Sequence, residues 1–343
     1  MRGLFLPNFE VGEIAEDDPS IFAANKIVAH DRYWFFKHMP DMDMKVIDNS
    51  APFPLNVVRD IIKIELCQPL KAFVAQSEYD VLISHSYNSG FVLSLLRSLA
   101  LRKRPPHIVI DVGSLNGGRS NPLQIALLRF ALRSVAGLIY HSSVNEEFYA
   151  KHFQNVKRVF VPYGTDVEFF KPLESVPSGD YALSIGYAKR DYQTLIEAWR
   201  KIDFPLKIVG RTDVDIRGLG NVEVIPKVSI SRLREYIHGS RFVVLPIGRD
   251  RYSVGQMTLT QCMSMSRAVI VAAVPGVADY AQHGVNCLLF RSGDAEDLVE
   301  KVNVLMRDPD TLRAISLRAR KDVIERFSEG RMAKEIMDFI RSC

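Results

Sequence analysis

Short apolar runs rich in valine, isoleucine and leucine alternate with amphipathic stretches along the first half of the chain. This alternation is typical of buried parallel strands that are covered by helices. Strands are predicted at residues 4–6, 45–48, 80–84, 107–111, 137–140 and 159–162. Helices are expected to fill the intervals between them.

The same alternation restarts at Tyr181 and predicts a second series of strands. These lie at residues 181–186, 206–210, 222–225, 242–246, 268–272 and 288–290. Long helical patterns then finish the chain at residues 297–307, 310–327 and 330–341. Between the two series, residues 163–179 have the glycine and proline content of a linker. The pattern therefore predicts two α/β domains.

Length and composition agree with two folded domains. A chain of 343 residues is long for one core, and 47% hydrophobic with 24% charged residues is ordinary globular composition. The net charge of +4 is too small to indicate nucleic-acid or lipid binding by itself. No apolar run is long enough to span a membrane, since the best candidate, residues 93–101, is interrupted by Arg97.

The four cysteines show neither CxxC spacing nor the density of a disulfide framework. A reducing compartment, and hence a cytoplasmic location, is the expectation. Two doubly wound domains in tandem would place the carboxyl ends of both sheets around a central cleft, where ligands of open α/β sheets bind. This layout suits a dehydrogenase, a binding protein or a sugar transferase, but no GxGxxG or Walker loop follows a strand.

Two short segments of the second domain have the chemistry to bind a diphosphate. Lys189 and Arg190 follow a predicted strand and Gly186, and arginine offers phosphate oxygens a bidentate fork. The turn at residues 254–256 opens a predicted helix, whose first amides and dipole form a second anion site. Solvated loop charges are the alternative interpretation of the basic pair.

A longer pattern runs from Pro246 to Phe290. The turn and helix of residues 253–264 are followed by a strand, then by a Pro-Gly-x-x-Asp loop at 275–279 and by residues 284–290. This order and spacing resemble the donor-binding half of family 4 glycosyltransferases. Residues 160–172 and 184–195 resemble other segments of that family, so that the likeness covers most of residues 135–340.

The resemblance implies the GT-B fold, with two Rossmann-like doubly wound domains facing a central cleft. It implies an acceptor-binding domain at residues 1–165, a donor-binding domain at 178–325, and a last helix at 330–343 that packs back on the first domain. The implied activity is metal-independent, cofactor-free transfer, with retention, of a sugar from a nucleotide-sugar such as a UDP- or GDP-sugar. A glycan or lipid-linked acceptor in cell-surface polysaccharide or glycolipid synthesis is expected.

The resemblance also implies the site residues. Positions expected to bind the donor are Gly12, Gly186, Lys189, Arg190, Ser253, Gly255, Gln256, Met257 and Gln261. Catalytic roles are assigned to Asp111, Ser253 and Arg190. Asp111 ends a predicted strand, where a carboxylate could orient or deprotonate an acceptor hydroxyl. His85 ends another strand, and for both residues a hydrogen-bonded turn is the alternative role.

The chain departs from the family at several of these positions. Ser253 and Gln261 stand where the family has two glutamates, and Tyr187 stands where an arginine is expected after Gly186. Gln261 can still accept a hydrogen bond from a ribose, whereas Ser253 cannot act as a carboxylate. A catalytically silent protein that binds a nucleotide or a partner enzyme is therefore the alternative function, and an epimerase or phosphorylase of the same fold is a third.

Two further features bear on metal and membrane binding. The Asp-x-Asp triplets at residues 41–43 and 213–215 do not follow strands in a metal-binding arrangement, and no metal is expected. Arginines among leucines near residues 97–104 and 129–133 favour peripheral attachment of the first domain to anionic lipid, at the inner membrane surface. A solvated helix face explains them equally well. No nucleic-acid partner is expected.

Overall fold

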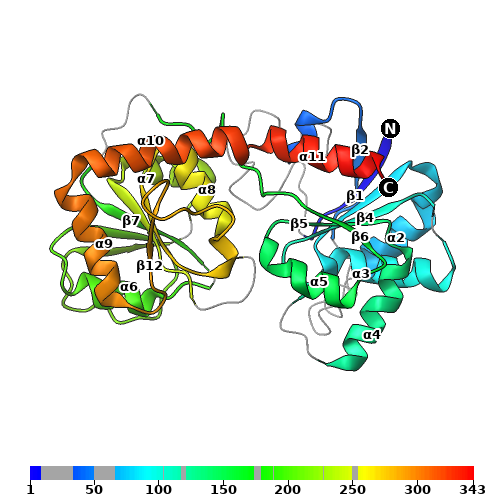
Figure 1. Cartoon of the computed structure of the whole chain (residues 1–343), viewed down its shortest axis with the longest axis horizontal. Helices are drawn as coiled ribbons and strands as arrows, with labels where there is room; N and C mark the ends of the chain where they lie inside the picture. Colours follow the sequence, from blue (N-terminus) through cyan, green and yellow to red (C-terminus); the bar gives the residue numbers. More distant parts are fainter. Residues whose placement is uncertain are drawn as a thin grey trace. The chain divides into compact units, whose positions relative to one another are not determined.

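The computed structural model describes residues 1–8, 34–49, 66–102, 104–116, 121–173, 179–187, 189–226, 228–248 and 254–343. It divides into two compact units, which are described separately here (Figure 1). Unit 1 comprises Met1–Pro162 and Gly330–Cys343, and unit 2 comprises Tyr163–Glu329. Unit 2 includes Thr165 because its amide donates to the Phe327 carbonyl at 2.8 Å and its hydroxyl lies 2.6 Å from that of Thr260.

Unit 1 is built on a parallel sheet in the order β2-β1-β3-β4-β5-β6. Its strands are β1 (Arg2–Leu6), β2 (Asp43–Val46), β3 (Val81–His85), β4 (His107–Asp111), β5 (Gly137–Tyr140) and β6 (Lys157–Phe160). Its helices include η2 (Trp34–His38), α2 (Cys67–Ala75), α3 (Tyr87–Leu99), α4 (Pro122–Ala131), α5 (Glu146–His152) and α11 (Glu329–Arg341). Strand β2 begins before the predicted 45–48, because Asp43 to Val46 pair with Arg2 to Phe5.

Both faces of this sheet are covered. Alternate residues of a strand point to opposite faces. On β1, Phe5 belongs to an apolar cluster with residues of η2 and α11, whereas Leu4 and Leu6 belong to a second cluster with residues of α2 and α3. Unit 1 is therefore a three-layer structure whose central strands are apolar on both sides, as their continuous Val, Ile and Leu runs predict.

Unit 2 repeats this architecture with the strand order β12-β11-β10-β7-β8-β9. Its strands are β7 (Ala182–Gly186), β8 (Leu206–Gly210), β9 (Val222–Ile225), β10 (Phe242–Leu245), β11 (Val269–Ala272) and β12 (Leu288–Phe290). Its helices are α6 (Tyr192–Trp199), α7 (Ile230–Gly239), α8 (Gln256–Ser264), η6 (Pro275–Val277), α9 (Ala295–Arg307) and α10 (Pro309–Arg326). All neighbouring strands pair in parallel.

The starts of the unit 2 helices are fixed by local side chains. Asp191, Ser229, Asp294 and Asp308 each precede a helix and accept a hydrogen bond from an amide of its first turn. Such caps satisfy amides that have no acceptor within the helix. Helix α8 differs, since Gly255 precedes it in a left-handed conformation with φ of 92°. The start of α8 therefore carries no capping side chain.

The strand order places a topological switch point in unit 2. From β7 the chain proceeds to β8 and β9 on one side of the sheet, then to β10, β11 and β12 on the other. Ligands of open α/β sheets bind beyond the carboxyl ends of the strands at such a point. A ligand site is therefore expected at the loops that follow β7 and β10. The two sheets confirm the predicted α/β class with two Rossmann-like domains.

The described helices include none that is both long and apolar enough to cross a membrane. The longest of them, α10, carries arginine, lysine and acidic residues along its length. This observation agrees with the interrupted apolar runs of the sequence.

The buried imidazole of His107 makes the stability of unit 1 depend on pH. Its Nε2 lies 2.8 Å from the Ser84 hydroxyl, and burial, followed by the charge of Arg97, lowers the pKa of His107 to about 3. The unfolded chain protonates this ring near pH 6.5, whereas the folded chain keeps it neutral. Stability is thus complete above pH 6.5 and falls by about 1.4 kcal/mol per pH unit as the pH drops toward 3.

This dependence can be measured by chemical denaturation between pH 7 and 4. A His107→Gln variant is expected to be less stable at pH 7 but to lose less stability on acidification, because glutamine takes up no proton. Parallel pH profiles of the parent chain and the variant would contradict this role of His107.

Candidate functional site

The loop that follows β7 is shaped by Gly186. Its φ of 148° lies in a region that side chains rarely adopt. The Tyr192 hydroxyl donates to the Gly186 carbonyl at 2.6 Å, and a Cβ at Gly210 would lie 2.5 Å from that hydroxyl. Two glycines and one tyrosine therefore fix the path of the chain out of β7.

Arg190 folds back over this glycine. Its Nε donates to the Ile185 carbonyl at 2.8 Å, and a Cβ on Gly186 would lie 2.7 Å from the guanidinium carbon. Burial lowers the pKa of Arg190, although the side chain remains partly accessible. A guanidinium that has lost much of its water gains more than an exposed one from an anionic ligand.

The loops after β7 and β10 are joined by backbone contacts. Arg190 forms an antiparallel bridge with Ile247, and the Asp191 amide donates to the Pro246 carbonyl at 2.7 Å. The Gly248 amide donates to the carbonyl of Lys189, whose φ of 57° is left-handed. Lys189 itself is exposed. The loop of Lys189 and Arg190 is thus held at the switch point by the end of the neighbouring strand.

The start of α8 lies against the same loop. A Cβ on Gly255 would collide with the Ile247 side chain, which leaves room only for glycine. In the first turn of α8, the Thr258 hydroxyl lies 3.4 Å from Nη2 of Arg190. The positive end of the helix dipole and the Arg190 guanidinium therefore converge on one region.

The structure brings together most of the predicted site residues of unit 2. Gly186, Lys189 and Arg190 lie in the first loop, and Gly255, Gln256, Met257 and Gln261 lie on α8 or at its start. Gln256 is buried, Met257 is exposed, and Gln261 follows Thr258 by three residues, on the same helix face. Gly12 and Ser253 lie outside the described residues.

Sequence reasoning missed Thr258. A threonine three residues after a helix-opening glycine is not a recognisable site residue in the sequence. Thr258 lies near Arg190 only because the Arg190 side chain folds back onto β7. Tyr187, which takes the place of an expected arginine, is about half exposed, and its pKa is raised by burial.

Gly186→Ala tests whether this glycine positions Arg190. An added methyl group would displace the guanidinium and strain the backbone, so we expect a loss of about 1–3 kcal/mol of stability and a roughly tenfold weaker affinity for a nucleoside diphosphate. Calorimetric titration measures the second effect. Gly220→Ala is the matched control, since a Cβ there meets no atom within 4 Å. In an Arg190→Ala background, Gly186→Ala should cost no further affinity, and a second full loss would contradict this coupling.

The carboxyl edge of the unit 1 sheet holds Asp111, which is fully buried. Its carboxylate accepts hydrogen bonds from the amide and hydroxyl of Ser114, from the Leu115 amide and from the Tyr149 hydroxyl. These contacts hold the turn after β4 and tie it to α5. These contacts agree with the alternative role of Asp111, that of a hydrogen-bonded turn residue.

His85 and His141 also end strands at this edge. The His85 Nδ1 lies 2.9 Å from the Asn8 side-chain oxygen, and the His141 Nδ1 lies 2.8 Å from the Val161 carbonyl. Burial, followed by the charge of His141, lowers the pKa of His85 to about 3. Both rings are therefore neutral at physiological pH, when they can accept a proton or a hydrogen bond but carry no charge.

No cluster of three metal-ligating side chains is found among the residues that the structure describes. In the triplet at 213–215, Asp215 pairs with Arg217 at 2.8 Å. That carboxylate thus has a structural partner of its own.

Unit 2 is similar to known proteins. Residues 181–308, from β7 to the end of α9, match the family of glycosyl transferases group 1. This segment of the chain thus resembles a group 1 glycosyltransferase domain. The segment contains Arg190, the start of α8 and the switch point between β7 and β10.

One curated relative was found, an uncharacterised glycosyltransferase of Methanocaldococcus jannaschii. It is 24% identical over 149 residues, which cover 40% of this chain and 42% of the relative. The match thus spans less than half of the relative's length.

Solved structures resemble this chain over its whole length. A sucrose-phosphate synthase of Thermosynechococcus elongatus is similar with a TM-score of 0.73 at 16% identity, covering 100% of this chain and 99% of that one. HepE of Anabaena in complex with UDP is similar with a TM-score of 0.73 at 16% identity, covering 100% of both chains. At such identities these matches show the fold, which is GT-B.

Proposed function

We propose that this chain is a glycosyltransferase that moves a sugar from a nucleotide-sugar to a hydroxyl group of an acceptor. The observation that carries this proposal is the placement of the Arg190 guanidinium between the end of β7 and the first turn of α8. A cation and the positive end of a helix there suit a diphosphate, which is the leaving group of such a reaction.

The mechanism uses these groups as the glycosidic bond breaks. Negative charge grows on the diphosphate oxygen as it leaves the anomeric carbon, and Arg190, Lys189 and the amides at the start of α8 stabilise that charge. The acceptor oxygen bonds to the same carbon, and its proton is taken up by the departing phosphate. Retention is proposed from the family resemblance, with the acceptor approaching from the face that the diphosphate leaves.

UDP- and GDP-sugars are the proposed donors, and no cofactor is required for the step as written. Structures of HepE in complex with UDP and with UDP-glucose, from a chain of the same fold, support a uridine donor as the first to test. Gln261 is placed on the Thr258 face of α8 and can accept a hydrogen bond from the ribose through its amide oxygen.

We place acceptor binding in unit 1 and donor binding in unit 2. A glycan or lipid-linked acceptor in polysaccharide or glycolipid synthesis stays a prediction. Attachment of unit 1 to an anionic membrane surface is supported by exposed leucines that lie among arginines near the ends of α3 and α4. These leucines are Leu99, Leu101, Leu123 and Leu127.

Release of free UDP or GDP from a panel of nucleotide-sugars tests the proposal. We expect release with one donor, stimulated by a matching glycan or lipid-linked acceptor and lost in Arg190→Ala. The rival function, nucleotide binding without transfer, is favoured by Ser253 and Gln261 in place of glutamates. Tight nucleotide binding without release from any donor–acceptor pair would support that rival.

A further inference from the structure

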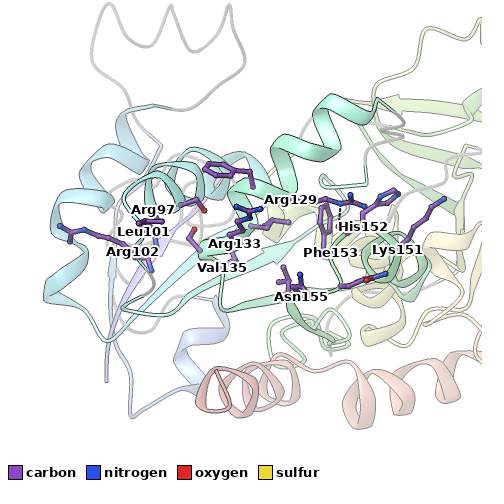
Figure 2. Close-up of a pocket in the computed structure, with 16 residues that line it drawn as sticks. Arg97, Leu101, Arg102, Arg129, Arg133, Val135, Lys151, His152, Phe153 and Asn155 are labelled. Carbon is purple, nitrogen blue, oxygen red and sulfur yellow. Dashed lines mark hydrogen bonds between the residues drawn. The ribbon is translucent and has the colours of Figure 1, made fainter.

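Unit 1 contains an open cavity of about 710 Å³ on the side away from its strand carboxyl ends (Figure 2). Its lining includes Val135, two residues before β5, and Val156, directly before β6. The last residues of α3, α4 and α5 complete the wall. The cavity therefore lies at the amino ends of the strands, the edge opposite to the one where substrates of α/β sheets bind.

The lining of this cavity is strongly cationic. Among the residues that the structure describes, it includes five arginine and lysine side chains together with His152, and no aspartate or glutamate. The five are Arg97, Arg102, Arg129, Arg133 and Lys151. Figure 2 shows that these side chains come from several elements, so the charge is not confined to one helix.

The arginines of the cavity have neutral partners among the described residues. Within the described part of the chain, none of the five forms an ion pair with an aspartate or glutamate. Arg102 and Arg133 lie over the rings of Phe73 and Phe130, and the Arg129 Nε donates to the His152 carbonyl at 2.9 Å. Such contacts leave the positive charge in place.

Arg97 adds a buried cation to the wall. It has no exposed surface, contacts the Gln76 side chain and donates to the Pro105 carbonyl at 2.6 Å, and its Nε has no hydrogen-bond partner. Burial and then the charge of Arg102 lower its pKa to about 10. Burial, followed by Lys151 and Arg129, likewise lowers the pKa of His152. In both cases burial is the larger cause, and the neighbouring cations add to it.

Neutralisation of helix ends explains only part of this charge. The ends of α3, α4 and α5 each contribute roughly half a negative charge, which is far less than the five cations supply. We therefore propose that the cavity is a binding site for a phosphate-bearing ligand with at least two negative charges. It is separate from the donor site, which lies in unit 2, and it does not rest on the proposed transfer.

Two sources could supply this ligand chemistry, a free phosphate compound or the headgroup of an anionic lipid. Leu101 lines the cavity with 88% of its surface exposed, and Phe130, which also lines it, is half-buried. An apolar rim next to a cationic hollow accommodates a phosphate that is attached to acyl chains. The experiment must therefore separate the two sources.

The first arm is calorimetric titration with inorganic pyrophosphate at low ionic strength, in an Arg190→Ala background that disables the donor site. We expect binding, and a loss of about tenfold or more when Arg102, Arg133 and Lys151 are all changed to glutamine. The matched control changes the exposed Lys45, Arg313 and Lys334, which lie outside the cavity, and should bind pyrophosphate like its parent. Thermal unfolding checks that each variant is folded.

The second arm is cosedimentation with vesicles of phosphatidylcholine, with and without phosphatidylglycerol. Binding that needs phosphatidylglycerol and is lost only in the cavity variant assigns the site to a lipid headgroup, whereas binding of pyrophosphate alone assigns it to a soluble ligand. The proposal is overturned if neither probe binds, or if the cavity variant and the control variant behave alike. With Arg190 intact, the cavity variant should still bind a nucleoside diphosphate, so that failure of one site is distinguished from failure of the other.

Discussion

Arg190→Ala is expected to weaken the binding of UDP or GDP about 100-fold, because hydrogen bonds from a charged donor contribute about 1.5–3 kcal/mol each and a guanidinium can form two to a diphosphate. The Arg190 Nε already donates to the Ile185 carbonyl. A bound diphosphate would therefore have to contact the other nitrogens of the guanidinium. Isothermal titration with each nucleoside diphosphate measures the loss.

Matched variants separate this effect from a general loss of charge. Arg200→Ala removes an exposed arginine of unit 2 outside the loop and should leave the affinity unchanged. Lys189→Ala should cost less than Arg190→Ala, since an exposed ammonium gains less from an anion than a partly buried guanidinium. If the parent chain and a folded Arg190→Ala variant bind the nucleoside diphosphate with equal affinity, Arg190 is not part of the donor site.

Asp111→Ala is expected to destabilise unit 1 by about 3 kcal/mol, the largest effect on folding that we predict. The change removes the acceptor of the Ser114, Leu115 and Tyr149 donors, and a buried donor without an acceptor costs about 1–3 kcal/mol. Urea denaturation followed by a probe of unit 1 measures the change.

Asp111→Asn distinguishes a structural carboxylate from a catalytic one. Asparagine keeps the shape and one acceptor oxygen, so we expect this variant to recover much of the stability and to retain sugar transfer. Tyr149→Phe should cost about 1 kcal/mol, since it removes one hydrogen bond from the network. A stable Asp111→Asn variant that has lost sugar transfer would show that the Asp111 carboxylate takes part in the reaction.

The fold was predictable because buried parallel strands appear in the sequence as short, continuous apolar runs. Runs such as Leu4-Phe5-Leu6 and Val243-Val244-Leu245 are apolar at every position, which only a sheet covered on both faces requires. Strand boundaries were less predictable where apolar and polar residues alternate. The first and last residues of β2 are set by its pairing with β1, and the local sequence does not reveal that pairing.

Parts of the candidate site were predictable for a similar reason. Lys189 and Arg190 follow a strand and Gly255 precedes a helix, and these are local features of the chain. The contact of Arg190 with Thr258, 68 residues further on, depends on how β7 and β10 pair. Asp111 shows the same limit, because its position at a strand end does not reveal the hydrogen bond that it accepts from Tyr149. A catalytic role for Asp111 stays a prediction.

The most direct test of the donor site is a crystal structure of this chain with UDP or GDP bound. The account predicts that the diphosphate lies within hydrogen-bond distance, about 3 Å, of the Arg190 guanidinium and of the amides at the start of α8. A diphosphate bound instead at the cationic cavity of unit 1, with Arg190 still turned onto Gly186 and empty of ligand, would contradict it.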